Sequence, residues 1–176
     1  LNVYARSKLT GERAVADNNA RAIILRTNLF GWNCRPKLSL AEWVLDRLES
    51  GTPFPGFEDV VFAPLLVNDL ADIIFDLIDR GGSGLYHAGS AEAMSKYEFA
   101  RLIARVFDLD ADLVRPARLA DQPLAAPRPL NTALRADKLS RELNRTMPAM
   151  TDMVQRFKTL RTGGYVARLK AMAEAD

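Results

Sequence analysis

Short apolar runs that do not alternate with polar residues are the feature that most constrains how this chain folds. The run AIILR at 22–26 is rich in β-branched residues, and LYHA at 85–88 is a second run of similar length. Runs of this kind suit strands that are covered on both faces, as in a parallel sheet. Helix patterns lie between them, so the order of elements predicts an α/β fold.

Helix patterns fill most of the remaining chain. We expect helices over residues 3–18, 38–49, 69–80, 96–107, 136–143 and 151–160, and an amphipathic segment through residue 173. Ser39 and Ser95 are the expected N-caps of two of these helices, and Glu98 completes the capping-box spacing with Ser95. Two further strand candidates, at 60–66 and 113–118, each contain a proline.

Two of the helices carry apolar faces, and we expect that of the first to be buried. The helix over 3–18 has Leu9, Ala14 and Val15 on such a face. The helix over 69–80 has a longer stripe, made of Leu70, Ile73, Ile74, Leu77 and Ile78. Asn68 or Asp69 is the expected N-cap of this second helix, so we interpret Asp69 as a cap rather than as a catalytic acid.

The composition excludes several classes of function. The chain has 24 Lys and Arg against 22 Asp and Glu, so its charge gives no reason to expect a nucleic acid or an anionic membrane as partner. Cys34 is the only cysteine, which excludes an intrachain disulfide and leaves no zinc cluster available. The longest apolar runs, about six residues, are far shorter than a membrane span. We therefore expect a cytoplasmic protein without a metal site.

Tyr4 and Lys8 are the first candidates for catalysis. Residues four apart lie on the same face of a helix, so the phenol and the ammonium group are expected side by side. A neighbouring cation favours the phenolate and makes a phenol a better general acid. The spacing alone has low specificity, because a Tyr and a Lys four residues apart occur by chance on many helices.

Five segments, in order along the chain, resemble the extended short-chain dehydrogenases/reductases. They are YARSKLTGE (4–12), ILRTNLFGWN (24–33), PLLVNDLA (64–71), GLYHAG (84–89) and RPLNTAL (128–134). The first is similar to the YxxxK segment of that superfamily, and the third to its hVxDhA segment, where h is an apolar residue. The last looks like the RPxxSxL segment of dTDP-4-dehydrorhamnose reductases, with Thr132 in the place of the serine.

This resemblance implies a reductase that acts on a nucleotide sugar. A nicotinamide cofactor, NADPH or NADH, would deliver hydride to the 4-keto group of a nucleotide-linked 6-deoxy sugar. By position in the motif, Tyr4 would donate the proton, and Lys8 would assist it and also hold the nicotinamide ribose. The backbone at Thr27, Asn28 and Leu29 would face the nicotinamide.

The resemblance also implies a set of substrate contacts. Asn28, Trp32, Asn33 and Arg128 would meet the nucleoside-diphosphate sugar, with the guanidinium group paired to the diphosphate. From the residues alone, two alternatives stay open. Trp32 either stacks on a sugar or base or packs in the core, and Arg128 either binds the diphosphate or is solvated. His87, the only histidine, is interpreted as structural.

In its fold, the chain is expected to be the C-terminal portion of a doubly wound, Rossmann-like parallel sheet domain interleaved with a smaller, mostly helical substrate-binding lobe. We expect residues 1–31 and 67–90 in the sheet domain, and residues 32–66 and 91–176 in the lobe. The chain begins inside a helix pattern and contains no GxxGxxG turn between a strand and a helix. We expect that turn, and the Ser or Thr that binds the substrate carbonyl, before residue 1.

A chain with these features is expected to be inactive by itself. A dinucleotide would lack its pyrophosphate site. The apolar stripe of the 69–80 helix would lose its partner and stay exposed, which favours self-association or a homo-oligomer. Two other functions remain open for the complete protein: an epimerase or dehydratase of another nucleotide sugar, and a non-catalytic regulatory protein like the β subunit of methionine adenosyltransferase, which the chain also resembles.

Overall fold

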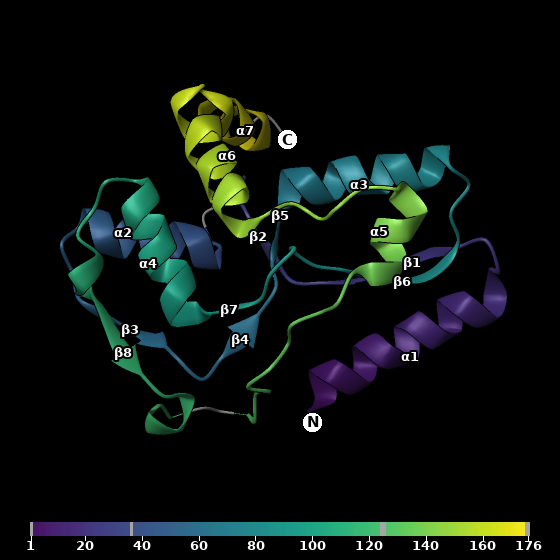
Figure 1. Cartoon of the computed structure of the whole chain (residues 1–176), viewed down its shortest axis with the longest axis horizontal. Helices are drawn as coiled ribbons and strands as arrows, with labels where there is room; N and C mark the ends of the chain where they lie inside the picture. Colours follow the sequence, from purple (N-terminus) through teal and green to yellow (C-terminus); the bar gives the residue numbers. More distant parts are fainter. Residues whose placement is uncertain (1, 36, 124–125, 175–176) are drawn as a thin grey trace.

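The computed structural model describes residues 2–35, 37–123 and 126–174 (Figure 1). Its helices are α1 (Val3–Asn18), α2 (Leu40–Glu49), α3 (Val67–Asp79), α4 (Lys96–Val106), α5 (Asp137–Leu143), α6 (Met150–Thr162) and α7 (Tyr165–Glu174). Its strands are β1 (Ile23–Thr27), β2 (Leu29–Phe30), β3 (Phe54–Phe57), β4 (Val61–Phe62), β5 (Leu65–Leu66), β6 (Gly84–Ala88), β7 (Met94–Ser95) and β8 (Val114–Ala117). Two 3-10 helices, Ala111–Leu113 and Leu119–Asp121, flank β8.

The strands form pairs, and the longest pair is parallel. β1 and β6 run side by side with Ile23 opposite Gly84 and Thr27 opposite Ala88. β2 with β5 and β3 with β8 are also parallel, whereas β4 and β7 are antiparallel. A parallel pair needs a long crossover, and α2 and α3 lie within the one that joins β1 to β6. The α/β prediction is therefore confirmed.

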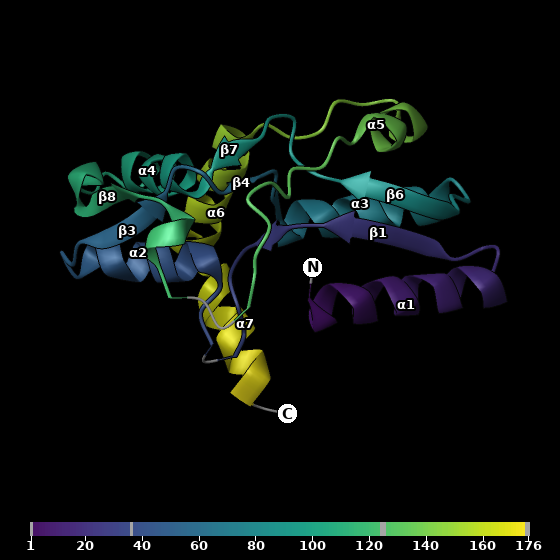
Figure 2. The same ribbon diagram turned by 90° about the horizontal axis from the view of Figure 1, so that it is seen from below.

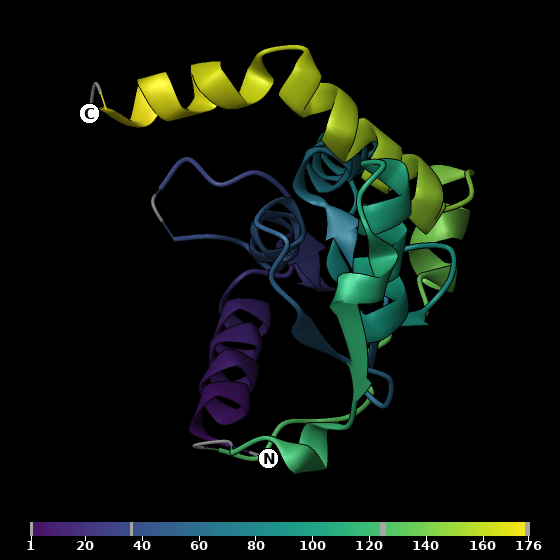
Figure 3. The same cartoon turned by 90° about the vertical axis from the view of Figure 1, so that its left-hand side faces the viewer.

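The elements gather at two ends of the molecule. In Figures 1 and 2, α1, β1, β6, α3 and α5 lie at one end, and α2, α4, β3 and β8 lie at the other. α6 packs on α4 and on β5, between the two groups, and α7 continues from it and projects away from the body (Figure 3). The division into a sheet domain and a substrate-binding lobe remains a prediction.

A buried aromatic cluster ties together β2, α4 and α6. Phe30 lies edge-on to Phe99 and to Phe157, with ring centroids 5.1 and 5.9 Å apart. Phe62 meets Phe99 at 5.3 Å, and Trp32 stacks on Phe157 at 4.1 Å. Such contacts add to the free energy that burial of the rings already contributes. One core therefore joins segments that are far apart in the sequence.

Both predicted N-caps are confirmed. The hydroxyl of Ser39 accepts a hydrogen bond from the backbone N–H of Glu42, and the Glu42 carboxylate accepts one from the N–H of Ser39. Ser95 and Glu98 form the same reciprocal pair at the start of α4. Each box satisfies two N–H groups that the first turn of a helix leaves without an intrahelical partner.

The expected N-cap of α3 is wrong. The helix begins at Val67, and no side chain caps it. The carboxylate of Asp69 instead pairs with Arg156 of α6, whose guanidinium group also lies 2.9 Å from Asp72. Because the helix begins two residues before Asp69, this carboxylate lies within the first turn instead of at the cap position, where it pairs with Arg156.

The apolar stripe of α3 is covered by the chain itself. Leu70, Ile73 and Leu77 are buried, and only Ile78 at the edge of the stripe is strongly exposed. α3 packs on β5 and on α5, which supply this cover. The expectation that the stripe would stay bare is therefore wrong.

The burial expected for α1 is also wrong. Leu9, Ala14 and Val15 are all exposed, and the helix has no buried residue. α1 lies beside β1 (Figure 2). Among the residues that the structure describes, a hydrogen bond from its cap and an ion pair connect it to other elements, and both are described with the site below.

Phe157 should be the aromatic residue whose loss most weakens the fold. It is fully buried and touches Phe30, Trp32 and Phe107. Phe157→Ala should lower the free energy of unfolding by about 3–5 kcal/mol, because it removes a large side chain and leaves a cavity. Phe75→Ala is the control, since Phe75 on α3 is 66% exposed and its loss should change stability by about 0.5 kcal/mol or less. Urea unfolding of both variants measures the difference, and equal losses would contradict this description of the core.

Candidate functional site

Tyr4 and Lys8 lie on one face of α1, as their spacing predicts. Asn2 caps the helix: its Oδ1 accepts a hydrogen bond from the N–H of Ala5 at 2.9 Å, and its Nδ2 donates to the Pro127 carbonyl at 3.1 Å. Tyr4 follows in the first turn, with 70% of its surface exposed. The Lys8 ammonium lies 5.6 Å from the centroid of the Tyr4 ring, within the range of a cation–π contact.

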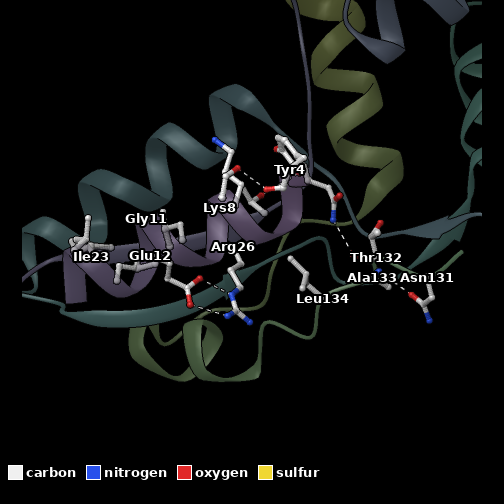
Figure 4. Close-up of a pocket in the computed structure, with 16 residues that line it drawn as sticks. Tyr4, Lys8, Gly11, Glu12, Ile23, Arg26, Asn131, Thr132, Ala133 and Leu134 are labelled. Carbon is white, nitrogen blue, oxygen red and sulfur yellow. Dashed lines mark hydrogen bonds and ion pairs between the residues drawn. The ribbon is translucent and has the colours of Figure 1, made fainter. Parts of the chain in front are cut away.

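Both side chains line a groove of about 1000 Å³ (Figure 4). Its walls are α1, the strand β1 and the segment 131–134. Thr27 and Asn28, at the carboxyl end of β1, also line it. Ligands of open parallel sheets bind at the carboxyl ends of the strands. The groove runs along the whole of β1, and its end at Thr27 and Asn28 lies where such a fold places a site. The structure thus brings together Tyr4, Lys8, Thr27 and Asn28.

The segment 130–134 is held across the groove by backbone hydrogen bonds. The N–H of Val61 donates to the Leu130 carbonyl at 2.7 Å, and the N–H of Thr132 donates back to the Val61 carbonyl at 2.9 Å. Asn28 completes the link, since its Nδ2 donates to the Thr132 carbonyl at 2.9 Å. A Cβ on Gly89 would lie 2.9 Å from the Leu134 carbonyl oxygen, so a glycine is needed where the segment passes the end of β6.

A bidentate ion pair joins the floor of the groove to α1. The Nε and Nη2 of Arg26 each lie 2.8 Å from a carboxylate oxygen of Glu12 (Figure 4). The hydrogen bond to Arg26 lowers the pKa of Glu12, against the opposing effect of burial. The charges of Arg13 and of His87, which stands opposite Arg26 on β6, act in the same direction as Arg26. Sequence reasoning assigned no role to this pair, although both residues belong to the recognised motifs.

Three of the predicted site residues lie outside the groove lining. Leu29 is 48% exposed on β2. Trp32 stacks on Phe157 and donates its indole N–H to the Phe157 carbonyl at 2.9 Å, so in this structure it packs against α6. The Asn33 side chain donates to the Lys37 carbonyl at 2.7 Å and orders its own loop. Their assignment to cofactor or substrate binding stays a prediction.

Arg128 is the fourth, and its charge acts on Lys96, a lysine to which sequence reasoning gave no role in the site. Lys96 opens α4 directly after the Ser95 cap, where a cation opposes the helix dipole. Burial lowers the pKa of the Lys96 ammonium, and the nearby charge of Arg128 lowers it further. The sequence offered one indication of a role for Lys96. A cation in the first turn of a helix is unfavourable, so helix stability does not explain a lysine at this position.

Residues 1–161 match the family described as the RmlD substrate binding domain. The chain belongs to this family. α7 begins after the matched region and is an element beyond it. The match confirms the reductase-like resemblance of the sequence motifs.

Relatives of this RmlD-type chain include proteins of two kinds. It is 34% identical to the probable low-salt glycan biosynthesis reductase Agl14 of Haloferax volcanii, over 86% of this chain and 52% of that protein. It is 32% identical to methionine adenosyltransferase 2 subunit beta of Xenopus laevis, over 80% of this chain and 44% of that protein. The chain thus spans about half the length of the curated relatives it matches.

A solved structure supports the same fold. The dTDP-4-dehydrorhamnose reductase of Bacillus anthracis, in complex with NADP, superposes with a TM-score of 0.79 and 24% identity, over 90% of this chain and 55% of that one. Within residues 2–35, 37–123 and 126–174, no helix has the length and apolar character to cross a membrane. The same residues hold no group of three or more His, Cys, Asp and Glu side chains placed to bind a metal ion.

Removal of Arg26 should release the carboxylate of Glu12. Arg26→Gln should raise the pKa of Glu12 toward its usual value of 4.5, because the largest cause of its lowering is lost. The stability that the pair contributes to the parent protein is present above pH 4.5 and is lost as the pH falls through the lowered pKa of Glu12. The variant has no such pair, so its stability should not show this decrease. Carboxyl NMR titration measures the change. Glu98, whose pKa is lowered by the backbone N–H of Ser95, is the internal control and should not move.

Proposed function

We propose that the protein carrying this chain reduces the 4-keto group of a nucleotide-linked 6-deoxy sugar, with Tyr4 as the proton donor. The observation that carries the proposal is the Tyr4–Lys8 pair on the wall of a groove at the carboxyl end of β1, in a chain of the RmlD substrate binding domain family. Similarity to a glycan biosynthesis reductase supports the same class of reaction.

The chemistry of the pair fits this role. A ketone that accepts hydride becomes an alkoxide-like oxygen, and a positioned phenol can donate a proton to it. The Lys8 ammonium favours the phenolate that Tyr4 becomes when it gives up that proton. The exposed Tyr4 hydroxyl is open to a ligand, and the groove would shield that ligand from water on the side of β1.

The groove also suits the reacting end of a nicotinamide cofactor. When bound, NADPH or NADH would supply the hydride. Lys8 would hold the ribose hydroxyls, while Thr27, Asn28 and Leu29 would border the nicotinamide. The Thr27 hydroxyl already donates to the Asn28 carbonyl at 3.1 Å, which keeps this turn compact. We assign residues 1–31 and 67–90 to the cofactor side of the site, and residues 32–66 and 91–176 to the substrate side.

Arg128 and Lys96 would bind the diphosphate of the substrate. Burial lowers the pKa of the Lys96 ammonium, and the positive charge of Arg128 lowers it further, so an anion that neutralises both cations would bind favourably. Arg128 lies three residues before the groove-lining segment 131–134, so a ligand could reach both. We also assign Trp32 and Asn33, on the loop that follows β2, to the border of the sugar.

A second candidate is a non-catalytic role in a complex with another protein. The 32% identity to methionine adenosyltransferase 2 subunit beta is the observation that favours it. In that role Tyr4 and Lys8 would bind a ligand without turning it over. The two candidates differ in one measurable property, which is the dependence of turnover on the Tyr4 hydroxyl.

Tyr4→Phe should lower kcat by a factor on the order of 10² or more, because it removes the proton donor and leaves the ring in place. The KM for the nucleotide sugar should change little. Steady-state reduction of dTDP-4-dehydrorhamnose by the protein as its own gene encodes it is the measurement. An unchanged kcat would refute the assignment of Tyr4, and the absence of turnover in the parent protein would favour the non-catalytic candidate.

Arg128→Gln should weaken the binding of dTDP by about tenfold, the effect of losing a charged hydrogen bond. Calorimetric titration with dTDP and with free rhamnose measures the preference, and the parent protein should favour dTDP. Arg135→Gln is the matched control, because Arg135 pairs with Asp137 and is strongly exposed outside the groove. Equal, weak binding of both ligands by the parent would contradict the diphosphate site.

A further inference from the structure

Helix α1 is attached to the rest of the described chain with little apolar packing. The helix carries Tyr4 and Lys8, yet it has no buried residue along its 16 positions. Apolar packing is the usual means of fixing a helix on a sheet. Within the part of the chain that the structure describes, side-chain hydrogen bonds join this helix and its cap to other elements at two places: Asn2 to the Pro127 carbonyl, and Glu12 to Arg26.

We propose that Glu12 and Arg26 are a positioning pair that fixes α1 on β1 and so sets the place of Tyr4 and Lys8 in the groove. The expected effect of the pair on turnover rests on the proposed function, whereas the attachment of α1 to β1 does not. Glu12 is one turn beyond Lys8 and two turns beyond Tyr4, and all three line the same groove with Arg26 (Figure 4). A contact at Glu12 therefore fixes both the height and the rotation of the face that bears the reacting groups.

The geometry of the pair suits this role. Two parallel N–H···O bonds of 2.8 Å between a guanidinium fork and a carboxylate define an orientation, which a single-point contact would not do. The Glu12 side chain is only 19% exposed, whereas that of Arg26 is 43% exposed. The side chain on the helix is thus the better enclosed of the two, as expected if β1 holds the helix.

The pair also frees Lys8 for Tyr4. Lys8 and Glu12 are four residues apart on one helix, so an unpaired Glu12 carboxylate would compete with the Tyr4 ring for the ammonium group. Arg26 engages both oxygens of that carboxylate. The other charged groups that act on Glu12 are Arg13 on the same helix and His87 on β6, and neither bonds to its carboxylate.

The test is a double-substitution cycle in the protein as its own gene encodes it. Glu12→Gln and Arg26→Gln should each lower kcat by about tenfold or more, since small displacements of a reacting group are costly, with KM changed by less than about twofold. The double variant should be no slower than the slower single variant, because both substitutions remove the same contact. Parental kcat in both single variants, or losses that multiply in the double variant, would overturn the proposal.

A second measurement needs no substrate. Amide hydrogen exchange over residues 3–18 should be faster in both single variants than in the parent, because the helix loses its attachment. Asp76→Asn is the matched control: it removes a comparable ion pair, 3.0 Å from Arg145, on α3, and should leave exchange in α1 and kcat unchanged. Unchanged exchange in the Glu12 and Arg26 variants would overturn the positioning role.

The two measurements separate this inference from the proposed function. If Tyr4→Phe is impaired while the Glu12 and Arg26 variants are not, the positioning pair is wrong and the reductase proposal stands. If the parent reduces no sugar but exchange in α1 still responds to both substitutions, the pair positions α1 and the proposed reaction is wrong.

Discussion

The parallel pairing of β1 with β6 is the constraint on which the rest of the structure depends. It sets Thr27 opposite Ala88, so two chain segments leave the sheet at the same edge. Asn28 and Gly89 are the next residues, and the segment 130–134 passes between them and the end of β4. A one-residue slip in register would exchange the two faces of each strand and separate these contacts. The groove exists because this register holds.

Helices α3 and α6 are joined to each other by ion pairs, and α6 is joined to the aromatic core. Arg156 of α6 bridges Asp69 and Asp72 on α3. Burial lowers the pKa of the Arg156 guanidinium, but the two carboxylates together outweigh that effect and raise it. α6 in turn carries Phe157, the ring on which Trp32 and Phe30 pack. The loop that follows β2 therefore cannot shift without disturbing the aromatic cluster. Trp32 thus anchors the start of that loop to the core.

Local features were the part of the fold that the sequence could predict. The strands at 22–26 and 85–88 and the caps at Ser39 and Ser95 depend on residues close together in the chain. The cap expected at Asp69 was wrong because its carboxylate pairs with Arg156, which is far along the sequence. Tyr4 and Lys8 were predicted to be neighbours because a helix alone sets their spacing.

Contacts between distant segments were beyond sequence reasoning. The pairing of Glu12 with Arg26 depends on how a helix lies on a strand, and the effect of Arg128 on Lys96 depends on the path of a loop. Neither follows from periodicity or capping signals. The packing of Trp32 on Phe157 likewise joins two residues that are 125 positions apart in the sequence.

The arrangement of charge argues for a ligand with two different ends. The groove offers a phenol with an ammonium group beside it, which suits a carbonyl that gains a proton. The cations at Lys96 and Arg128 suit a dianion, and the segment 128–134 joins them to the groove. A free sugar would satisfy only the first of these, and a nucleotide only the second. Under the proposed function, a nucleoside-diphosphate sugar satisfies both. Its diphosphate, bound by the two cations, would position the sugar carbonyl at the Tyr4 hydroxyl, although α1 itself has no buried residue.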